Sequence, residues 1–148
     1  MPAPADDPLA LERQVCFALS VASRSVLGLY RPLLEPMGLT HPQYLVMLAL
    51  WGQSPLSVKR IGQLLQLDAA TLSPLLKRLE ASGYLTRERN SSDERQLVVE
   101  LTPAGRRLRK RAEQIPPAIM AELGMSVGEL TELHARLTAL IAASKRSS

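Results

Sequence analysis

One stretch decides the fold of this 148-residue chain, and it runs from residue 57 to residue 101 as SVKRIGQLLQLDAATLSPLLKRLEASGYLTRERNSSDERQLVVEL. Its first half predicts two short helices, because apolar residues recur there at helical spacing behind residues that cap helices well. Ser57 caps the first helix, and Asp68 or Thr71 caps the second. Only Gln66-Leu67 lies between the two helices, so the turn that joins them is tight.

A hairpin follows the second helix. Gly83 ends that helix, because glycine adopts the left-handed backbone of a helix terminus at low cost. Residues 84–89 and 96–101 predict strands, and the polar residues 90–95 between them predict a turn with a charged tip. The order of helix, tight turn, helix and hairpin places the second helix outward, where it can enter the major groove of DNA.

Further helices precede this centre. Residues 9–35 predict one long helix with an apolar stripe, which Pro32 bends or ends. The residues of the stripe recur every three or four positions and are Leu11, Val15, Leu19, Ala22, Val26 and Leu29. Thr40 and Gln43 predict a capping box for a second helix, which runs to Trp51 and is apolar nearly all round. We therefore expect this second helix to be buried.

The C-terminal part predicts two more helices. Thr102-Pro103 opens the first of them with a cap and a first-turn proline, and Pro116-Pro117 breaks it. Ser126-x-x-Glu129 caps a last helix that runs to about Ala142. The chain is therefore expected to form a single domain over residues 1–148, mainly α with a small β-hairpin, which is an α+β fold.

Composition excludes several classes of protein. Apolar residues make up 46% and charged residues 22%, so the chain is neither disordered nor built for the bilayer. No apolar run reaches the roughly 18 residues of a membrane span, and residues 1–7 lack the order of an export signal, so we expect a cytoplasmic protein. One cysteine and two separated histidines leave no internal disulfide, no metal site and no cofactor to predict.

The distribution of charge says more than the net charge of +4. Residues 57–112 hold twelve lysines and arginines against six acidic residues, which leaves +6 there and −2 elsewhere. A basic middle between weakly charged ends suits a module that binds a polyanion. The alternative is that the charged helices only keep the protein in solution.

Two groups of polar side chains point to a nucleic-acid surface. The second helix mixes short donors with long cations, which suits base edges near its start and phosphates further along. The members of this mixed set are Thr71, Ser73, Lys77 and Arg78. The hairpin adds cations for phosphates or for the narrow minor groove, namely Arg87, Arg89 and Arg95. Each of them taken singly is more often a solvated surface residue, so the interpretation rests on the order of elements together with the basic excess.

This region resembles the MarR family of regulators. Residues 67–87 look like that family's recognition helix running into its first wing strand, and Asp93-Glu-Arg95 followed by Leu101-Thr-Pro-Ala-Gly105 is similar to its wing signature. The resemblance covers about residues 10–142. It implies a winged helix-turn-helix transcription regulator rather than an enzyme, with Asp93 holding Arg95 in position for the minor groove.

The resemblance also implies how the chain is organised. Residues 57–101 would form the DNA-binding winged helix, and residues 9–35 and 103–142 would interlock as the dimerisation helices of a homodimer. The partner would be double-stranded DNA with a pseudo-palindromic operator. The residues expected to bind DNA are Lys59, Ala69, Thr71, Ser73, Lys77, Arg78, Arg87, Asp93 and Arg95.

Cys16 admits two interpretations. It lies beside Val15 of the apolar stripe, and most free cysteines are small buried hydrophobes. A reactive thiolate instead needs hydrogen-bond donors nearby. Tyr30 faces the same side of the helix but lies about 21 Å further along it, so the two cannot touch within one chain. If two such helices cross antiparallel in a dimer, Tyr30 of one subunit can approach Cys16 of the other, and His41 could join it.

A second resemblance bears on this cysteine. Residues 14–17, 30–34 and 39–45, together with Trp51 and residues 56–59, look like the OhrR-type branch, the organic hydroperoxide resistance regulators. In that branch the matching cysteine senses peroxide and tyrosines of the partner subunit hydrogen-bond to it. The resemblance therefore implies that Cys16 is the redox sensor and that Tyr30 supports it. His41 and Ser20 depart from the pattern, because the branch often has tyrosines there.

The hypothesis that follows is a repressor that leaves its operator when organic hydroperoxide oxidises Cys16. No second cysteine is present to form an intramolecular disulfide, so a low-molecular-weight thiol would cap the oxidised sulfur. One alternative is a MarR-type repressor relieved by reversible binding of a small phenolic ligand. A thiol peroxidase is disfavoured because the cysteine lies on a helix suited to packing and has no resolving partner. An activator, or a protein-interaction module without DNA binding, are further alternatives.

Overall fold

The computed structural model describes residues 7–11, 14–90 and 93–146, and the side chains of residues 90 and 93–95 lie outside the description. The chain forms two compact units, Met1–Glu113 and Gln114–Ser148. The helices of the first unit are α1 (Val15–Leu34), the short 3-10 helix η2 (Glu35–Met37), α2 (His41–Gly52), α3 (Val58–Leu65), α4 (Ala69–Ala81) and α5 (Pro103–Ala112). Its strands are β1 (Leu56–Ser57), β2 (Leu85–Asn90) and β3 (Asp93–Leu101). The second unit holds α6 (Ile115–Leu123) and α7 (Val127–Arg146).

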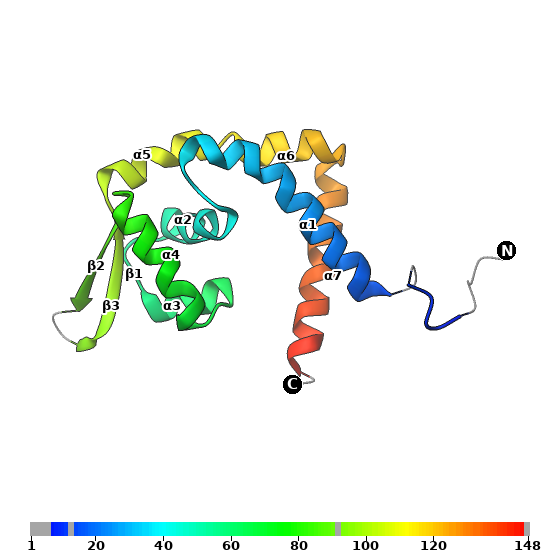
Figure 1. Cartoon of the computed structure of the whole chain (residues 1–148), viewed down its shortest axis with the longest axis horizontal. Helices are drawn as coiled ribbons and strands as arrows, with labels where there is room; N and C mark the ends of the chain where they lie inside the picture. Colours follow the sequence, from blue (N-terminus) through cyan, green and yellow to red (C-terminus); the bar gives the residue numbers. More distant parts are fainter. Residues whose placement is uncertain (1–6, 12–13, 91–92, 147–148) are drawn as a thin grey trace. The chain divides into compact units, whose positions relative to one another are not determined.

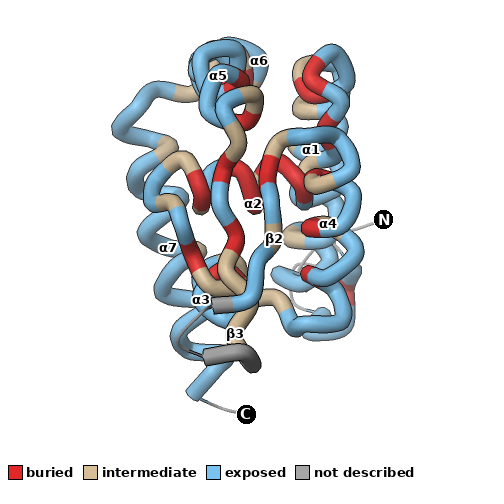
Figure 2. Tube along the Cα trace, turned by 90° about the vertical axis from the view of Figure 1, so that its left-hand side faces the viewer, coloured by how far each residue is buried: buried red, intermediate tan, exposed pale blue. Residues whose placement is uncertain are grey.

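The core of the first unit forms around α2. Val46, Met47 and Leu50 of this helix are almost completely buried, in line with its nearly continuous apolar sequence. Figure 2 shows buried stretches in α2 and in α4. The buried residues share one face of the helix, and Leu48, which lies away from that face, is 43% exposed, so the expectation of a buried helix is only partly met. The capping box at Thr40 is present, with the Gln43 amide donating to Thr40 Oγ1 and the Thr40 amide donating to Gln43 Oε1.

The helix pair α3 and α4 has the predicted tight turn. The Ser57 hydroxyl caps α3 by accepting the Arg60 amide, and Gln66 takes a left-handed backbone conformation with φ of 57°. Asp68, rather than Thr71, caps α4, because its carboxylate accepts the Thr71 amide at 2.7 Å. Pro74 therefore lies inside α4.

The hairpin begins at the end of α4, where Gly83 has the left-handed backbone expected of it, with φ of 84°. The strands pair antiparallel with Leu85 opposite Leu101 and Arg87 opposite Val99, and a register shift follows Arg89. Both strands extend further than predicted, because pairing continues beyond this shift into the segment expected to be a turn. β2 lies at an edge of the sheet, which has the strand order β1-β3-β2.

The strand β1 was not predicted. Leu56 and Ser57 pair with Val99 and Val98, and this pairing adds a third strand to the sheet. Two residues carry no alternation of apolar and polar side chains, so the sequence held no signal for a strand here.

The first helix is shorter than predicted. It begins at Val15 rather than at residue 9, and it runs two residues beyond Pro32 to end at Leu34. The Asp7 carboxylate accepts the Leu9 amide and the Gln14 side chain donates to the Ala10 carbonyl, so local hydrogen bonds hold a turn in front of the helix. α1 packs against α2 (Figure 1).

The second unit corrects the C-terminal prediction. The prolines 116 and 117 do not interrupt a helix but lie in the first turn of α6, where a missing amide hydrogen costs least. The preceding helix α5 has already ended at Ala112. Ser126 and Glu129 form the predicted cap, and α7 continues to Arg146, beyond the expected end near residue 142. Within the described residues, no helix combines the length and apolar character that a bilayer crossing requires.

Candidate functional site

α4 presents the surface expected of a helix that enters a DNA groove. Leu72, Leu76 and Leu79 point into the core and are each 1% exposed. The residues of this helix that the sequence assigned to DNA are exposed, and they are Ala69, Thr71, Ser73, Lys77 and Arg78. One stripe of leucines therefore fixes the helix and leaves its polar residues outward.

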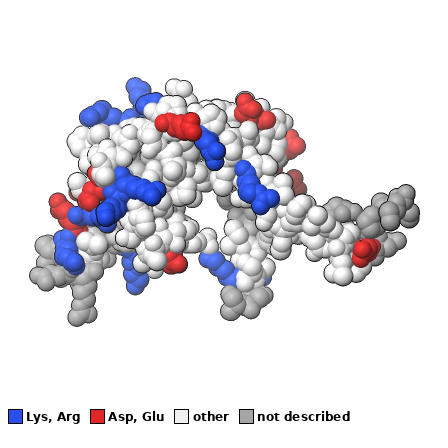
Figure 3. Space-filling model, in the orientation of Figure 1, with Lys and Arg blue, Asp and Glu red and all other residues white. Residues whose placement is uncertain are grey.

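Cations of neighbouring elements extend this surface. Lys59 lies exposed in the first turn of α3. Lysine and arginine side chains gather over the β2/β3 hairpin and α4, and another group covers α5 (Figure 3). Asp93 and Arg95 belong to β3, but their side chains fall outside the described residues, so the predicted contact between them stays a prediction.

Arg87 is engaged within the protein. Its side-chain Nε and Nη2 donate to Glu80 Oε1 at 3.3 and 3.1 Å, and its backbone amide donates to Glu80 Oε2 at 3.0 Å. These hydrogen bonds hold the pKa of the Glu80 carboxyl below its ordinary value. The pair joins α4 to β2, a connection that sequence reasoning missed because it assigned Arg87 to phosphates or the minor groove.

Cys16 lies in the first turn of α1 and is exposed, so the interpretation of a buried hydrophobe does not hold within the chain itself. Its apolar neighbours are also uncovered, with Val15 at 63% and Phe17 at 43% exposed. Leu34, the last residue of α1, is the one residue of this helix that is buried. The apolar stripe of α1 is therefore only partly covered, since Leu19, Val26 and Leu29 are half-buried while Val15 and Ala22 are exposed.

Tyr30 and His41 come together at the other end of α1. Their ring centroids lie 4.9 Å apart in an edge-on arrangement, and the buried ring of Tyr44 lies 6.0 Å from Tyr30. Burial raises the pKa of Tyr30, so its phenol stays protonated and can donate a hydrogen bond. Burial lowers the pKa of His41, which favours a neutral imidazole at this position. Tyr30 remains on the same helix as Cys16, 14 residues away, so one chain does not bring them together.

The aromatic contacts continue along α2 toward the hairpin. Tyr44 and Trp51 have ring centroids 6.4 Å apart, and the Trp51 indole donates to the Gly105 carbonyl at 2.9 Å. Gly105 lies in the first turn of α5, directly after β3. Sequence reasoning did not find this link, because a hydrogen bond across 54 residues leaves no local pattern.

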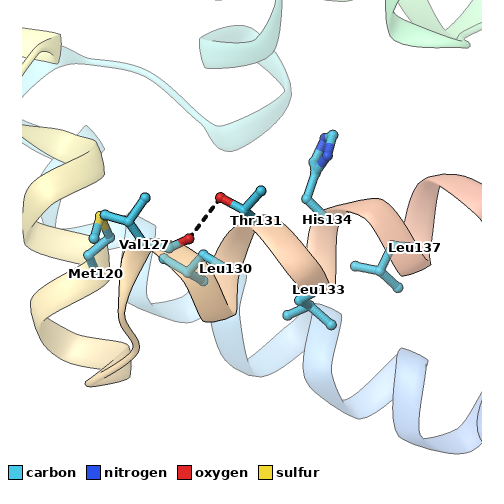
Figure 4. A pocket seen from close by; sticks show the side chains of 7 residues that line it. All are labelled: Met120, Val127, Leu130, Thr131, Leu133, His134 and Leu137. Carbon is cyan, nitrogen blue, oxygen red and sulfur yellow. Dashed lines mark hydrogen bonds between the residues drawn. The ribbon is translucent and has the colours of Figure 1, made fainter.

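The second unit carries an apolar groove of about 480 Å³ between the end of α6 and α7. Met120, Val127, Leu130 and Leu137 line it together with Thr131, Leu133 and His134 (Figure 4). No residue of α7 is buried among the described residues of the chain. The second unit thus also has uncovered apolar side chains.

Comparisons with known proteins agree with this arrangement. The sequence family described as transcriptional regulator SarA/Rot matches residues 28–112. The organic hydroperoxide resistance transcriptional regulator of Bacillus subtilis (strain 168) is 41% identical over 135 residues, which cover 91% of this chain and 92% of that regulator.

Solved structures give the same result. Reduced AbfR bound to DNA, a protein of Staphylococcus epidermidis, is 38% identical with a TM-score of 0.79, over 92% of this chain and 93% of AbfR. Overoxidized AbfR bound to DNA is 36% identical with a TM-score of 0.73, over 90% and 93%. MarR of E. coli, at 20% identity and a TM-score of 0.69 over 86% and 96%, shares the fold.

The outward polar face of α4, the hairpin beside it and these matches define a DNA-binding transcription regulator with a winged helix-turn-helix fold. We call α4 the recognition helix and the β2/β3 hairpin the wing, after the elements to which the sequence resemblance assigns these roles. The chain belongs to the MarR family of transcriptional regulators.

Proposed function

We propose that this regulator is a homodimeric repressor that leaves its operator when organic hydroperoxide oxidises Cys16. The observation that carries the proposal is the exposure of Cys16 on a helix whose apolar side chains next to the thiol, Val15 and Phe17, are also exposed. A thiol in that position is open to chemistry in one chain and becomes part of an interface when a second chain covers the helix. Oxidation of the thiol can then act on the pairing of subunits.

A second copy of the chain accounts for the uncovered apolar surfaces. Large apolar side chains are exposed on α1 at Val15, Phe17 and Leu27 and on α7 at Leu133 and Leu140. Exposed apolar surface of this kind marks an interaction site in a soluble protein. Twofold pairing would bring two recognition helices to successive major grooves of a pseudo-palindrome, about 34 Å apart.

Antiparallel pairing of the first helices would also complete the surroundings of the thiol. Tyr30 of the second copy would then approach Cys16 with a protonated phenol, and the neutral imidazole of His41 adds one more donor beside it. Donors of this kind stabilise a thiolate by hydrogen bonding. Tyr30 and His41 are therefore proposed as residues that support the sensing cysteine.

The chemistry proceeds in two steps. The thiolate sulfur attacks one oxygen of the hydroperoxide, an S–O bond forms as the O–O bond breaks, and the alkoxide leaves and takes up a proton as the alcohol. A low-molecular-weight thiol then condenses with the sulfenic acid to give a mixed disulfide and water. A thiol adduct adds bulk that a close-packed interface cannot accept unchanged.

Release from DNA has a definite energetic requirement. Changing occupancy from 99:1 to 1:99 needs a difference of about 5.5 kcal/mol in DNA affinity between the two forms. Two recognition helices and two wings must reach one duplex at the same time, so a modest repacking of the dimer misplaces several contacts together. Names of the relatives favour this proposal, since one relative is an organic hydroperoxide resistance regulator and AbfR is described in reduced and overoxidized forms.

The experiment compares the unaltered protein with Cys16→Ser. A labelled duplex, selected in vitro from a randomised library with the unaltered protein, is titrated before and after treatment with tert-butyl hydroperoxide and a small thiol. We expect the unaltered protein to release the duplex and Cys16→Ser to retain it. Mass spectrometry of the treated protein should show the thiol adduct at Cys16.

Two paired variants test the supporting role of Tyr30. Tyr30→Phe removes the proposed hydroxyl donor, whereas Tyr44→Phe removes the hydroxyl of the neighbouring buried ring. Oxidation of Cys16 should slow in the first variant and not in the second. If Cys16→Ser still releases DNA after peroxide, the redox proposal is wrong, and release by a phenolic compound alone would support the ligand-relieved alternative.

A further inference from the structure

An ion pair connects the recognition helix to the wing. Glu80 lies in the last turn of α4 and Arg87 lies in β2, with Gly83 at the turn between them. Backbone hydrogen bonds close that turn on one side, since the Gly83 amide donates to the Glu80 carbonyl and the Tyr84 amide to the Leu79 carbonyl. The carboxylate of Glu80 adds a second connection, by accepting hydrogen bonds from the backbone amide and the side chain of Arg87.

The geometry of the pair is specific to its place in the sheet. β2 is an edge strand, so the backbone amides on its outer side face no neighbouring strand. The backbone amide of Arg87 donates to Glu80 Oε2, while the guanidinium donates twice to Glu80 Oε1. Three charge-assisted hydrogen bonds from one residue to one carboxylate fix the direction of the strand more firmly than a single contact does.

The same contacts bear on how Arg87 can act. Its side chain is 24% exposed, against 37% for Glu80, and two of its nitrogens are already committed to the carboxylate. An arginine held in this way is poorly placed for phosphate, and its charge is neutralised by its partner. We propose that Glu80 and Arg87 are positioning residues that set the wing relative to the recognition helix, and that they promote DNA binding without Arg87 contacting phosphate.

Electrostatic repulsion and wing positioning predict opposite changes in DNA affinity when the charge of Glu80 is removed. A carboxylate in a DNA-binding unit repels the polyanion, so removing its charge should tighten binding if charge alone decides. Removing Glu80 should weaken binding if the carboxylate holds the wing in place. If the wing is then oriented for binding about a fifth of the time, Kd rises about fivefold.

The experiment measures Kd for the in vitro selected duplex with Glu80→Gln, Arg87→Gln and the double variant. Glu88→Gln is the matched control, because it removes an equal charge from an exposed residue of the same strand. We expect both single variants to raise Kd about fivefold, the double variant to raise it no further, and Glu88→Gln to leave Kd unchanged or lower. Thermal unfolding of each variant shows whether the protein is folded at the temperature of the binding assay. A loss of overall stability does not change the Kd of protein that remains folded.

Salt titration separates positioning from direct contact. Loss of one phosphate contact lowers the slope of log K against log salt by about 0.9, so a contacting Arg87 would give Arg87→Gln a lower slope than Glu80→Gln. The proposal expects one slope for both variants. It is overturned if Glu80→Gln binds as tightly as the unaltered protein, or if Arg87→Gln weakens binding by the same factor with and without Glu80.

Discussion

Gly105 offers a direct test of how the wing is anchored, through the substitution Gly105→Ala. A Cβ at this position would collide with the backbone carbonyl oxygen of Tyr84 and would come within 3.2 Å of the Leu101 side chain. The main obstacle is backbone, which cannot rotate away as a side chain can. α5 must therefore move off the start of the wing, and the hydrogen bond from Trp51 to the Gly105 carbonyl is put at risk with it.

The magnitude follows from three opposing effects. Alanine gains about 1 kcal/mol over glycine inside a helix. Overpacking costs about 1–3 kcal/mol, and contact with backbone belongs at the upper end of that range. Loss of the half-buried hydrogen bond from Trp51 costs about 1 kcal/mol more. We therefore expect Gly105→Ala to lower the free energy of unfolding by about 2–3 kcal/mol.

Urea denaturation at a fixed protein concentration measures this change, and Gly52→Ala is the matched control. Gly52 ends α2, and a Cβ there would meet nothing within 4 Å, so alanine should leave stability unchanged or raise it slightly. The two substitutions make the same chemical change with opposite expected signs. Stability of Gly105→Ala equal to that of Gly52→Ala would refute the packing argument.

Two further predictions concern α2. Thr40→Ala removes the Thr40 hydroxyl that accepts the Gln43 amide in the capping box. The free energy of unfolding should fall by about 1 kcal/mol in urea denaturation, and no change would mean that this cap is dispensable. Burial lowers the pKa of His41 below its ordinary value near 6.5, so the folded state binds this proton more weakly than the unfolded chain does. The contribution of neutral His41 to the free energy of unfolding should therefore be complete above about pH 6.5. It should decline as the pH falls toward the lower pKa of the folded state. His41→Gln should flatten that decline, and a pH profile that keeps its slope would contradict the assignment to His41.

Local patterns in the sequence predicted most of the DNA-binding part. Ser57, Thr40 and Gly83 occupy the helix ends that their chemistry favours, because capping depends on neighbours within four residues. The outward polar face of α4 agrees with the placement expected from the order of helix, tight turn, helix and hairpin. Boundaries were less predictable, as the late start of α1 at Val15 shows.

Contacts between distant residues could not be predicted in this way. The role of Arg87 depends on a carboxylate that folding brings beside it, and its charge alone suggested phosphate. Trp51 reads as one more apolar residue of α2 until its indole is seen to donate to Gly105. Hydrogen bonds between residues far apart in the sequence produce no periodic sequence pattern, so only the structure reveals them.

One helix connects the two ends of the proposed response. His41 is the first residue of α2 and Trp51 the last but one, so about 15 Å of helix joins the aromatic pair at Tyr30 to Gly105 in the first turn of α5. A packed helix transmits displacement along its axis with little compression. Under the proposed redox response, a displacement of α1 at Tyr30 would reach the start of α5 along α2, so the response would need no further element between the sensing cysteine and the wing.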